Sequence, residues 1–140
     1  MKVMFDTNIY ISYMRSGLHS EELERRGTVK YISGTVLMEL YAGAKTKEAE
    51  RLLQRNPRTY VATGRAIALY PEHYVAIGQF ISDLPAQYKT LIQKTAFLND
   101  IFIAFTAQSI GATLYTEDSD HFMIIGNRLP SVRIEFLQYP

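Results

Sequence analysis

The sequence contains no cysteine, and this absence excludes several kinds of chemistry. Disulfide bonds, thiolate nucleophiles and zinc sites built on cysteine all require a residue that the chain does not have. Tryptophan is also absent, and the formal net charge is only +1, so the protein carries no strong overall field. A polyanionic partner would therefore have to be held by a local basic patch or through a bound metal ion.

Long hydrophobic runs are missing as well. The longest apolar stretch, Ile101–Ala107, is far too short to span a membrane. Met1 leads directly into an apolar β-type run, without the charged region and cleavage site of a signal peptide. We therefore expect a cytoplasmic protein without a membrane anchor. Apolar residues make up 47% and charged residues 21% of the chain, which predicts one globular domain over residues 1–140.

Short β-type segments alternate with helical patterns along the chain. The predicted strands are Val3–Phe5, Val29–Ile32, Ala112–Tyr115 and Val132–Phe136. Helical periodicity separates them, with Gly17 and Gly43 as stop signals and Ser33 as a cap. Such alternation favours βαβ units, and hence an α/β fold whose mainly parallel sheet is covered on both faces.

Capping residues and helical spacing predict several further elements. Asn99 is placed as the N-cap of a helix that ends at Gly111, so that Asp100 lies in the first turn, where the helix dipole favours its ionised form. Helices are also predicted over Ser20–Gly27, capped by Ser20, over Lys45–Arg58, from Pro71 to Pro85, and over Ala86–Ala96. Tyr60–Thr63 and Ile67–Tyr70 are placed as short strands or extended pieces.

Carboxylates are the main candidates for functional groups in this sequence. Asp6 follows the first strand, Glu39 lies inside a helix, Asp100 comes near a helix start, and Asp118 follows a later strand with Glu117 and Asp120 beside it. If these acids converge, they repel one another and require a cation. Hard oxygen ligands favour Mg²⁺ or Mn²⁺. From spacing alone, they can equally be separate capping, turn and surface residues, and Glu39 can face either solvent or the crevice.

Three segments resemble the signature blocks of PIN-domain ribonucleases, most closely the VapC-type toxins of bacterial toxin–antitoxin pairs. They are FDTN at Phe5–Asn8, SGTVLMELYAGA at Ser33–Ala44 and NDIFIAFTAQSIGATLYTEDSDHF at Asn99–Phe122, and they occur in the family's order. The resemblance implies a three-layer α/β/α fold with a sheet of about five strands. It also implies an Mg²⁺-dependent (or Mn²⁺-dependent) endoribonuclease in which metal-activated water leaves a 5′-phosphate and a 3′-hydroxyl.

The resemblance also assigns roles to individual positions. Its four acids fall on Asp6, Glu39, Asp100 and Asp118, of which Asp6, Asp100 and Asp118 would hold the metal. Supporting polar residues fall on Asn8 and Thr116, and Asp120 competes with Asp118 for the fourth acidic position. The segment Leu84–Leu98 departs from the family pattern because it is longer than expected and lacks a glycine turn.

Contacts with a substrate are predicted only weakly. Arg15, Lys45 and Lys47 are the candidates for binding the RNA backbone, and only those that lie near the mouth of the crevice would matter. His121 can touch a phosphate, but a turn histidine beside Phe122 is the more ordinary interpretation. The tyrosines near the crevice, such as Tyr10, can stack on bases, although burial in the core is the default for aromatic side chains.

Two other functions compete with the nuclease hypothesis. A phosphoacceptor signalling domain also gathers acids around Mg²⁺, but it needs a lysine after the last strands, and the chain has none beyond Asp100. A non-catalytic PIN-like binding module would have no need for carboxylates that repel one another. For the nuclease, the expected partners are RNA, a cognate antitoxin with a basic side chain in the acidic crevice, and a second copy of the chain docked through the helix around Tyr74–Leu84.

Overall fold

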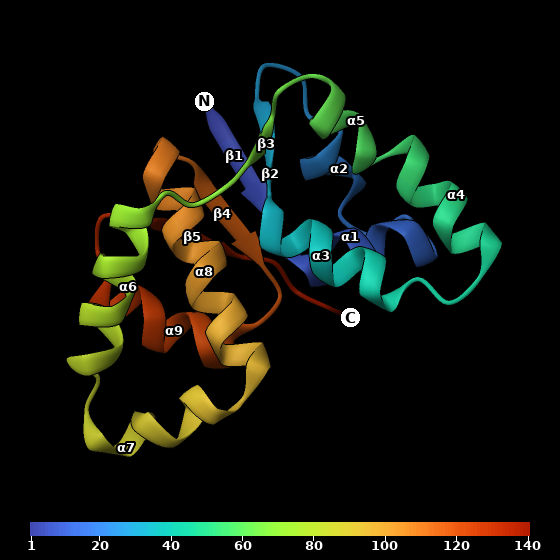
Figure 1. The fold of residues 1–140 in the computed structure, drawn as a ribbon. Helices are drawn as coiled ribbons and strands as arrows, with labels where there is room; N and C mark the ends of the chain where they lie inside the picture. Colours follow the sequence, from blue (N-terminus) through green and yellow to red (C-terminus); the bar gives the residue numbers. More distant parts are fainter.

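A parallel sheet of five strands forms the centre of the computed structural model, which describes residues 1–140 (Figure 1). The strand order is β3-β2-β1-β4-β5, and every neighbouring pair is parallel. The strands are β1 (Lys2–Phe5), β2 (Val29–Ser33), β3 (Ala66–Ile67), β4 (Thr113–Thr116) and β5 (Arg133–Phe136). This arrangement confirms the predicted α/β class with a mainly parallel sheet of about five strands.

Helices connect the strands and cover the sheet. They are α1 (Thr7–Ser16), α2 (Ser20–Leu23), α3 (Gly34–Gly43), α4 (Lys47–Arg55), α5 (Arg58–Ala62), α6 (Pro71–Ser82), α7 (Ala86–Lys89), the 3₁₀ turn η1 (Thr90–Gln93), α8 (Thr95–Ile110) and α9 (Ser119–Arg128). All four residues of β4 are buried, and so are Val3, Met4 and Phe5 of β1. Because successive side chains of a strand point to opposite faces, helices must cover both faces of the central strands.

The central strand β1 places the first acid beside the end of β4. β1 pairs with β2 on one side and with β4 on the other, and Phe5 is in register with Tyr115. The next residue, Asp6, donates its backbone N–H to the Tyr115 carbonyl at 2.9 Å. The carboxyl ends of β1 and β4 therefore lie side by side, at the edge where parallel sheets bind ligands.

Helix α8 is the main apolar support of this edge. Its residues Ile101, Ile103, Ala104 and Ala107 are fully buried, and it contacts β1, β2 and β4 on one side and α6 on another. A helix that is apolar nearly all round is stable only when buried, so α8 is held firmly inside the molecule. None of the helices combines the length and the hydropathy that crossing a membrane requires.

Several predicted helix boundaries are confirmed. Gly17 and Gly111 end α1 and α8 with φ values of 72° and 67°, a left-handed conformation that suits glycine. Ser33 caps α3, because its hydroxyl accepts a hydrogen bond from the Thr35 backbone N–H. Pro71 begins α6 as predicted, although the helix ends at Ser82, three residues before Pro85.

The start of α8 was predicted wrongly. The helix begins at Thr95 with Lys94 as its cap, so Asn99 is a helical residue and Asp100 lies in the second turn. The predicted helix over Ala86–Ala96 is also wrong, since α7 and η1 divide it and Lys94 then adopts an extended backbone (φ −92°, ψ 120°). The capping chemistry of Asn99 misled the prediction because its side chain has a tertiary partner instead, described below.

Four other local predictions require correction. The helix over Ser20–Gly27 is only the single turn α2, capped by His19 rather than Ser20. Tyr60–Thr63 forms the last residues and the C-cap of helix α5. Of Ile67–Tyr70, predicted as a short strand or an extended piece, only Ile67 belongs to a strand, β3. The helix predicted over Lys45–Arg58 is divided between α4 and α5 by a turn at Asn56–Pro57. Helix α9, which follows the acid cluster, was not predicted at all.

Candidate active site

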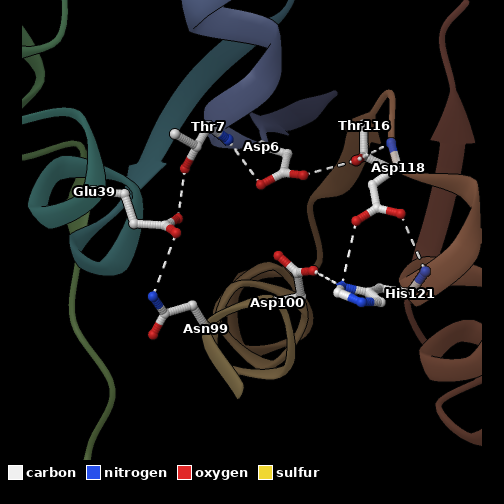
Figure 2. Close-up of polar contacts among 8 residues, drawn as sticks. All are labelled: Asp6, Thr7, Glu39, Asn99, Asp100, Thr116, Asp118 and His121. Atoms are coloured by element: carbon white, nitrogen blue, oxygen red, sulfur yellow. Dashed lines mark hydrogen bonds and ion pairs between the residues drawn. The ribbon is translucent and has the colours of Figure 1, made fainter. Parts of the chain in front are cut away.

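Asp6 lies at the junction of β1 and α1, and both of its carboxylate oxygens accept hydrogen bonds. One oxygen accepts the Thr7 backbone N–H at 2.8 Å, which caps α1. The other accepts the Thr116 hydroxyl, from the end of β4, at 2.7 Å. The side chain is almost completely buried. These contacts fix its orientation toward the space between the strand ends, as Figure 2 shows.

Glu39 faces this same space rather than solvent. Its Oε1 accepts the Thr7 hydroxyl at 2.7 Å, and its Oε2 accepts the Asn99 side-chain amide at 3.3 Å. The two donors come from α1 and α8, so the carboxylate of α3 is held between two other helices (Figure 2). The alternative of a solvent-facing Glu39, which the sequence left open, is therefore excluded.

Asp100, Asp118 and His121 form a compact cluster opposite Glu39 (Figure 2). His121 Nδ1 lies 2.6 Å from Asp100 Oδ2 and 3.3 Å from Asp118 Oδ2. The three ligand atoms that these residues offer lie within 4.8 Å of one another. Because the 2.6 Å contact joins two groups that can each accept, one of the two must carry a proton when no metal is bound.

Asp118 occupies its position because it caps helix α9. Its Oδ1 accepts the His121 backbone N–H at 3.1 Å, and its own N–H donates to the Thr116 hydroxyl at 3.0 Å. Its other oxygen, Oδ2, stays directed toward the cluster. Asp120, the competing candidate for the fourth acidic position, is exposed in the first turn of α9 and makes no side-chain hydrogen bond or ion pair. The geometry thus places Asp118, and not Asp120, among the converging acids.

Burial and mutual repulsion make two of these acids weak. Burial raises the pKa of Asp100 from 3.8 to about 9, with additional repulsion from Asp6, Asp118 and Glu39. Burial also raises the pKa of Asp6 to about 6, although the hydrogen bonds from Thr116 and Thr7 oppose this effect. The expectation that the dipole of α8 keeps Asp100 ionised is therefore wrong, since Asp100 lies beyond the first turn and desolvation dominates.

His121 is a site residue that the sequence interpretation undervalued. The sequence favoured an ordinary turn histidine, whereas the residue lies on α9, where its ring packs edge-on against Phe97 at a centroid distance of 5.1 Å. The available signal was the spacing itself: a cap at Asp118 places the side chain three residues later beside it on the first turn. That inference required α9, which was not predicted.

A second polar cluster supports the end of β4 from behind. The backbone N–H of Glu117 donates to the Asn8 side chain at 3.2 Å, and the Glu117 carboxylate accepts the Ser12 hydroxyl at 2.6 Å. The same carboxylate lies 2.9 Å from His19 Nε2, and both side chains are largely buried. Asn8 and Glu117 therefore tie the segment that carries Thr116 and Asp118 to helix α1.

The predicted substrate-binding cations lie outside the cluster. Arg15, at the end of α1, is exposed and lines the same groove as Glu39. Lys45 donates to the Ala42 carbonyl at 3.0 Å, and Lys47 begins α4. None of the three forms a salt bridge with a carboxylate, so their charges are available to a ligand.

The donor set fits a divalent cation. Four carboxylates from the ends of β1 and β4 and from helices α3 and α8 point toward one space, and no lysine or arginine forms a salt bridge with any of them (Figure 2). Oxygen atoms in this number suit Mg²⁺ or Mn²⁺. A cation here would remove the repulsion that raises the pKa of Asp100. Asp100, Asp118 and His121 offer ligand atoms within 4.8 Å of one another, and the carboxylate of Asp6 faces the same space (Figure 2).

Comparisons with known proteins agree with this architecture. A family model described as the PIN domain matches residues 3–125. The structure of VapBC2 from Rickettsia felis, bound to a DNA fragment from their promoter, is similar with 26% identity, a TM-score of 0.69, and coverage of 99% of this chain and 100% of that chain. A search of curated proteins returned no match.

Two further structures share the fold at lower identity. DNA-bound VapBC from Salmonella typhimurium has 24% identity and a TM-score of 0.64, and VapBC-1 from nontypeable Haemophilus influenzae has 21% and 0.62. Each match covers 97% of this chain and 98% of the other. These likenesses support the same three-layer fold over nearly the whole chain.

The raised pKa of Asp100 predicts that Asp100→Asn stabilises the metal-free protein. Between pH 3.8 and about 9, folding makes Asp100 take up a proton, so its contribution to stability falls as the pH rises through this window. Asparagine removes that loss. In EDTA we expect a melting temperature that exceeds wild type by about 4 °C at pH 8.5 and by much less at pH 5.

Asp120→Asn is the matched control, because it makes the same substitution on an exposed acid nearby. Its melting temperature should follow wild type at both pH values. An equal gain for Asp100→Asn at pH 5 and pH 8.5 would contradict a burial-raised pKa.

Proposed function

The chain belongs to the PIN-domain family, and on this basis we propose that it is a divalent-metal-dependent endoribonuclease, the toxin of a type II toxin–antitoxin module. The observation that carries the proposal is the convergence of Asp6, Glu39, Asp100 and Asp118 on one space without a lysine or arginine partner. The structural likeness to VapBC proteins supports the toxin assignment. We treat residues 1–140 as one catalytic domain of this kind.

The metal would be Mg²⁺ or Mn²⁺ held by Asp6, Asp100 and Asp118. When bound, it would supply an activated water and neutralise charge that develops on the scissile phosphate. Thr116 and Thr7 keep Asp6 oriented, since both donate hydrogen bonds to its carboxylate. As donors, they do not compete with the carboxylate for the cation. Glu39, held at both oxygens on the opposite side of the space from Asp118, would accept a proton.

RNA is the substrate that we propose. Attack of water on a phosphodiester, with departure of the ribose 3′-oxygen, leaves a 5′-phosphate and a 3′-hydroxyl. Arg15, Lys45 and Lys47 would contact the RNA backbone, because none of them has an acidic partner and Arg15 lines the same groove as Glu39. With cellular RNA as substrate, we expect the activity in the cytoplasm.

The first test is cleavage of a mixed RNA pool by the wild-type protein with Mg²⁺, with Mn²⁺ and with EDTA, followed by mapping of product ends. We expect metal-dependent cuts with 5′-phosphates, and a loss of about 100-fold or more in Asp6→Asn and in Asp100→Asn, because each removes a charge that the metal needs.

Asp120→Asn is again the matched control and should keep wild-type activity. If no pool is cleaved, and Mg²⁺ does not raise the melting temperature, the carboxylates do not form a metal site. That pair of results would replace the nuclease proposal with a non-catalytic binding module.

We further propose that a cognate antitoxin covers an apolar groove beside the active site. The groove lies between α1, α3 and α4, and Glu39 forms part of it together with Arg15 and apolar residues including Ile11, Met14, Leu40, Leu52 and Leu53. The partner segment would place apolar side chains along the walls of the groove. It would direct a basic side chain toward Glu39 and the acidic space beyond.

Leu52→Glu tests this surface. A glutamate in the groove would be desolvated without a partner, so we expect affinity for the co-expressed antitoxin to fall by about 100-fold while RNA cleavage persists. Pull-down and calorimetric titration measure the change. Gln54→Glu adds the same charge on an exposed position of α4 and should bind normally. Equal binding by both variants would exclude the groove.

A homodimer is the remaining partner that we propose. The dimer contact was expected on helix α6. Its residues Ile77 and Phe80 are buried in the core, whereas Tyr74 and Val75 are 54% and 64% exposed. Tyr74 and the exposed Met38 of α3 line one shared hollow. An apolar surface of this kind suits an isologous contact with a second copy.

Val75→Glu should convert the dimer into a monomer, because two like charges would meet across the two-fold axis. Light scattering coupled to size-exclusion chromatography measures the mass. Gln54→Glu, which adds the same charge on an exposed position of α4, is the charge-matched control. A wild-type protein that is monomeric at all concentrations would contradict the proposal.

A further inference from the structure

His121 differs in kind from the acids around it. Its Nδ1 is the only nitrogen ligand atom within the compact group formed with Asp100 and Asp118. The other two histidines lie elsewhere: His19 pairs with Glu117, and the Nδ1 of His73 accepts the Tyr70 backbone N–H. The sequence had suggested a pure oxygen site, whereas the structure adds an imidazole to it.

The position of the imidazole is fixed from two directions. Its backbone N–H is bound by Asp118 Oδ1, which secures the first turn of α9. Its ring packs edge-on against Phe97, a fully buried residue of α8. The ring is therefore held with Nδ1 directed between Asp100 Oδ2 and Asp118 Oδ2, at 2.6 and 3.3 Å.

The separations within this group are close to, but not yet equal to, those of atoms that share one ion. Ligands at about 2.1 Å from a cation lie at most about 4.2 Å from one another, and the three atoms already lie within 4.8 Å. Asp118 directs Oδ2 to this group, because its capping contact uses Oδ1. Only a small adjustment would bring all three atoms into one coordination shell.

We propose that His121 is a metal ligand, and that its nitrogen makes the site prefer Mn²⁺ to Mg²⁺. This inference rests on the proposed metal-dependent function and deepens it. Mg²⁺ is a hard ion that strongly favours oxygen, whereas first-row transition ions accept imidazole readily. Replacing one oxygen or water by Nδ1 therefore favours Mn²⁺ over Mg²⁺, although both bind the carboxylates.

The test is His121→Asn, which places a carbonyl oxygen or amide close to the position of Nδ1. Mn²⁺ and Mg²⁺ are titrated separately into wild type and variant by calorimetry at one pH. We expect the dissociation constant for Mn²⁺ to rise about tenfold, and the constant for Mg²⁺ to change less than about threefold. Melting curves in EDTA establish that the variant is folded.

Pulsed electron paramagnetic resonance of the Mn²⁺ complex gives a second measurement, independent of catalysis. A directly bound imidazole produces ¹⁴N coupling, which we expect in wild type and in Asp120→Asn but not in His121→Asn. His121→Asp, which restores a ligand as an oxygen, should bind both ions and lose the preference for Mn²⁺.

The outcomes separate the two proposals. If wild type binds both ions but shows no ¹⁴N coupling, and His121→Asn leaves the ratio of affinities unchanged, then His121 is only a hydrogen-bond partner, and the nuclease proposal stands without it. If wild type binds neither ion, the metal site itself is wrong, and both proposals are overturned.

Discussion

The repulsion among buried carboxylates is the constraint on which the site depends. Asp6 and Asp100 lie almost out of contact with water, and each faces other acids across a narrow space. Burial raises the pKa of both groups, and this repulsion raises it further, so both resist ionisation. The apolar packing of α8 and the hydrogen bonds of Thr7 and Thr116 supply the rigidity that keeps these acids from separating. A group of this kind is stable only when a proton or a cation offsets its charge.

The parallel sheet explains why residues from distant parts of the chain can meet in this way. With β1 in the centre, its carboxyl end adjoins that of β4, and residues separated by 110 positions, Asp6 and Thr116, form a buried hydrogen bond. The helices that follow these strands begin at the same edge, so their capping residues, Asp6 and Asp118, become site residues. Capping and site formation thus use the same side chains, one oxygen for each purpose in Asp118.

The sequence predicted the elements whose signals are local. Strands β1, β2, β4 and β5, the caps at Ser33, Gly17 and Gly111, and the order of the acids follow from periodicity and from turn chemistry. The side of α3 on which Glu39 lies could not be predicted, because its donors Thr7 and Asn99 come from other helices. Asn99 was mistaken for a helix cap for the same reason, because its side chain donates to Glu39 of another helix instead of capping its own.

His121 was undervalued because its importance depends on contacts that only the folded chain provides. A histidine three residues after an aspartate is an ordinary pair on a helix surface, and becomes a site residue only when α8 brings Asp100 to within 2.6 Å. Three agents could then meet the same electrostatic demand: a proton shared with His121 or, under the proposed function, a divalent cation or a basic side chain from the proposed antitoxin. Since they would occupy one space, each excludes the others. Inhibition by a basic residue would therefore act by displacing the cation, and would need no change in the fold.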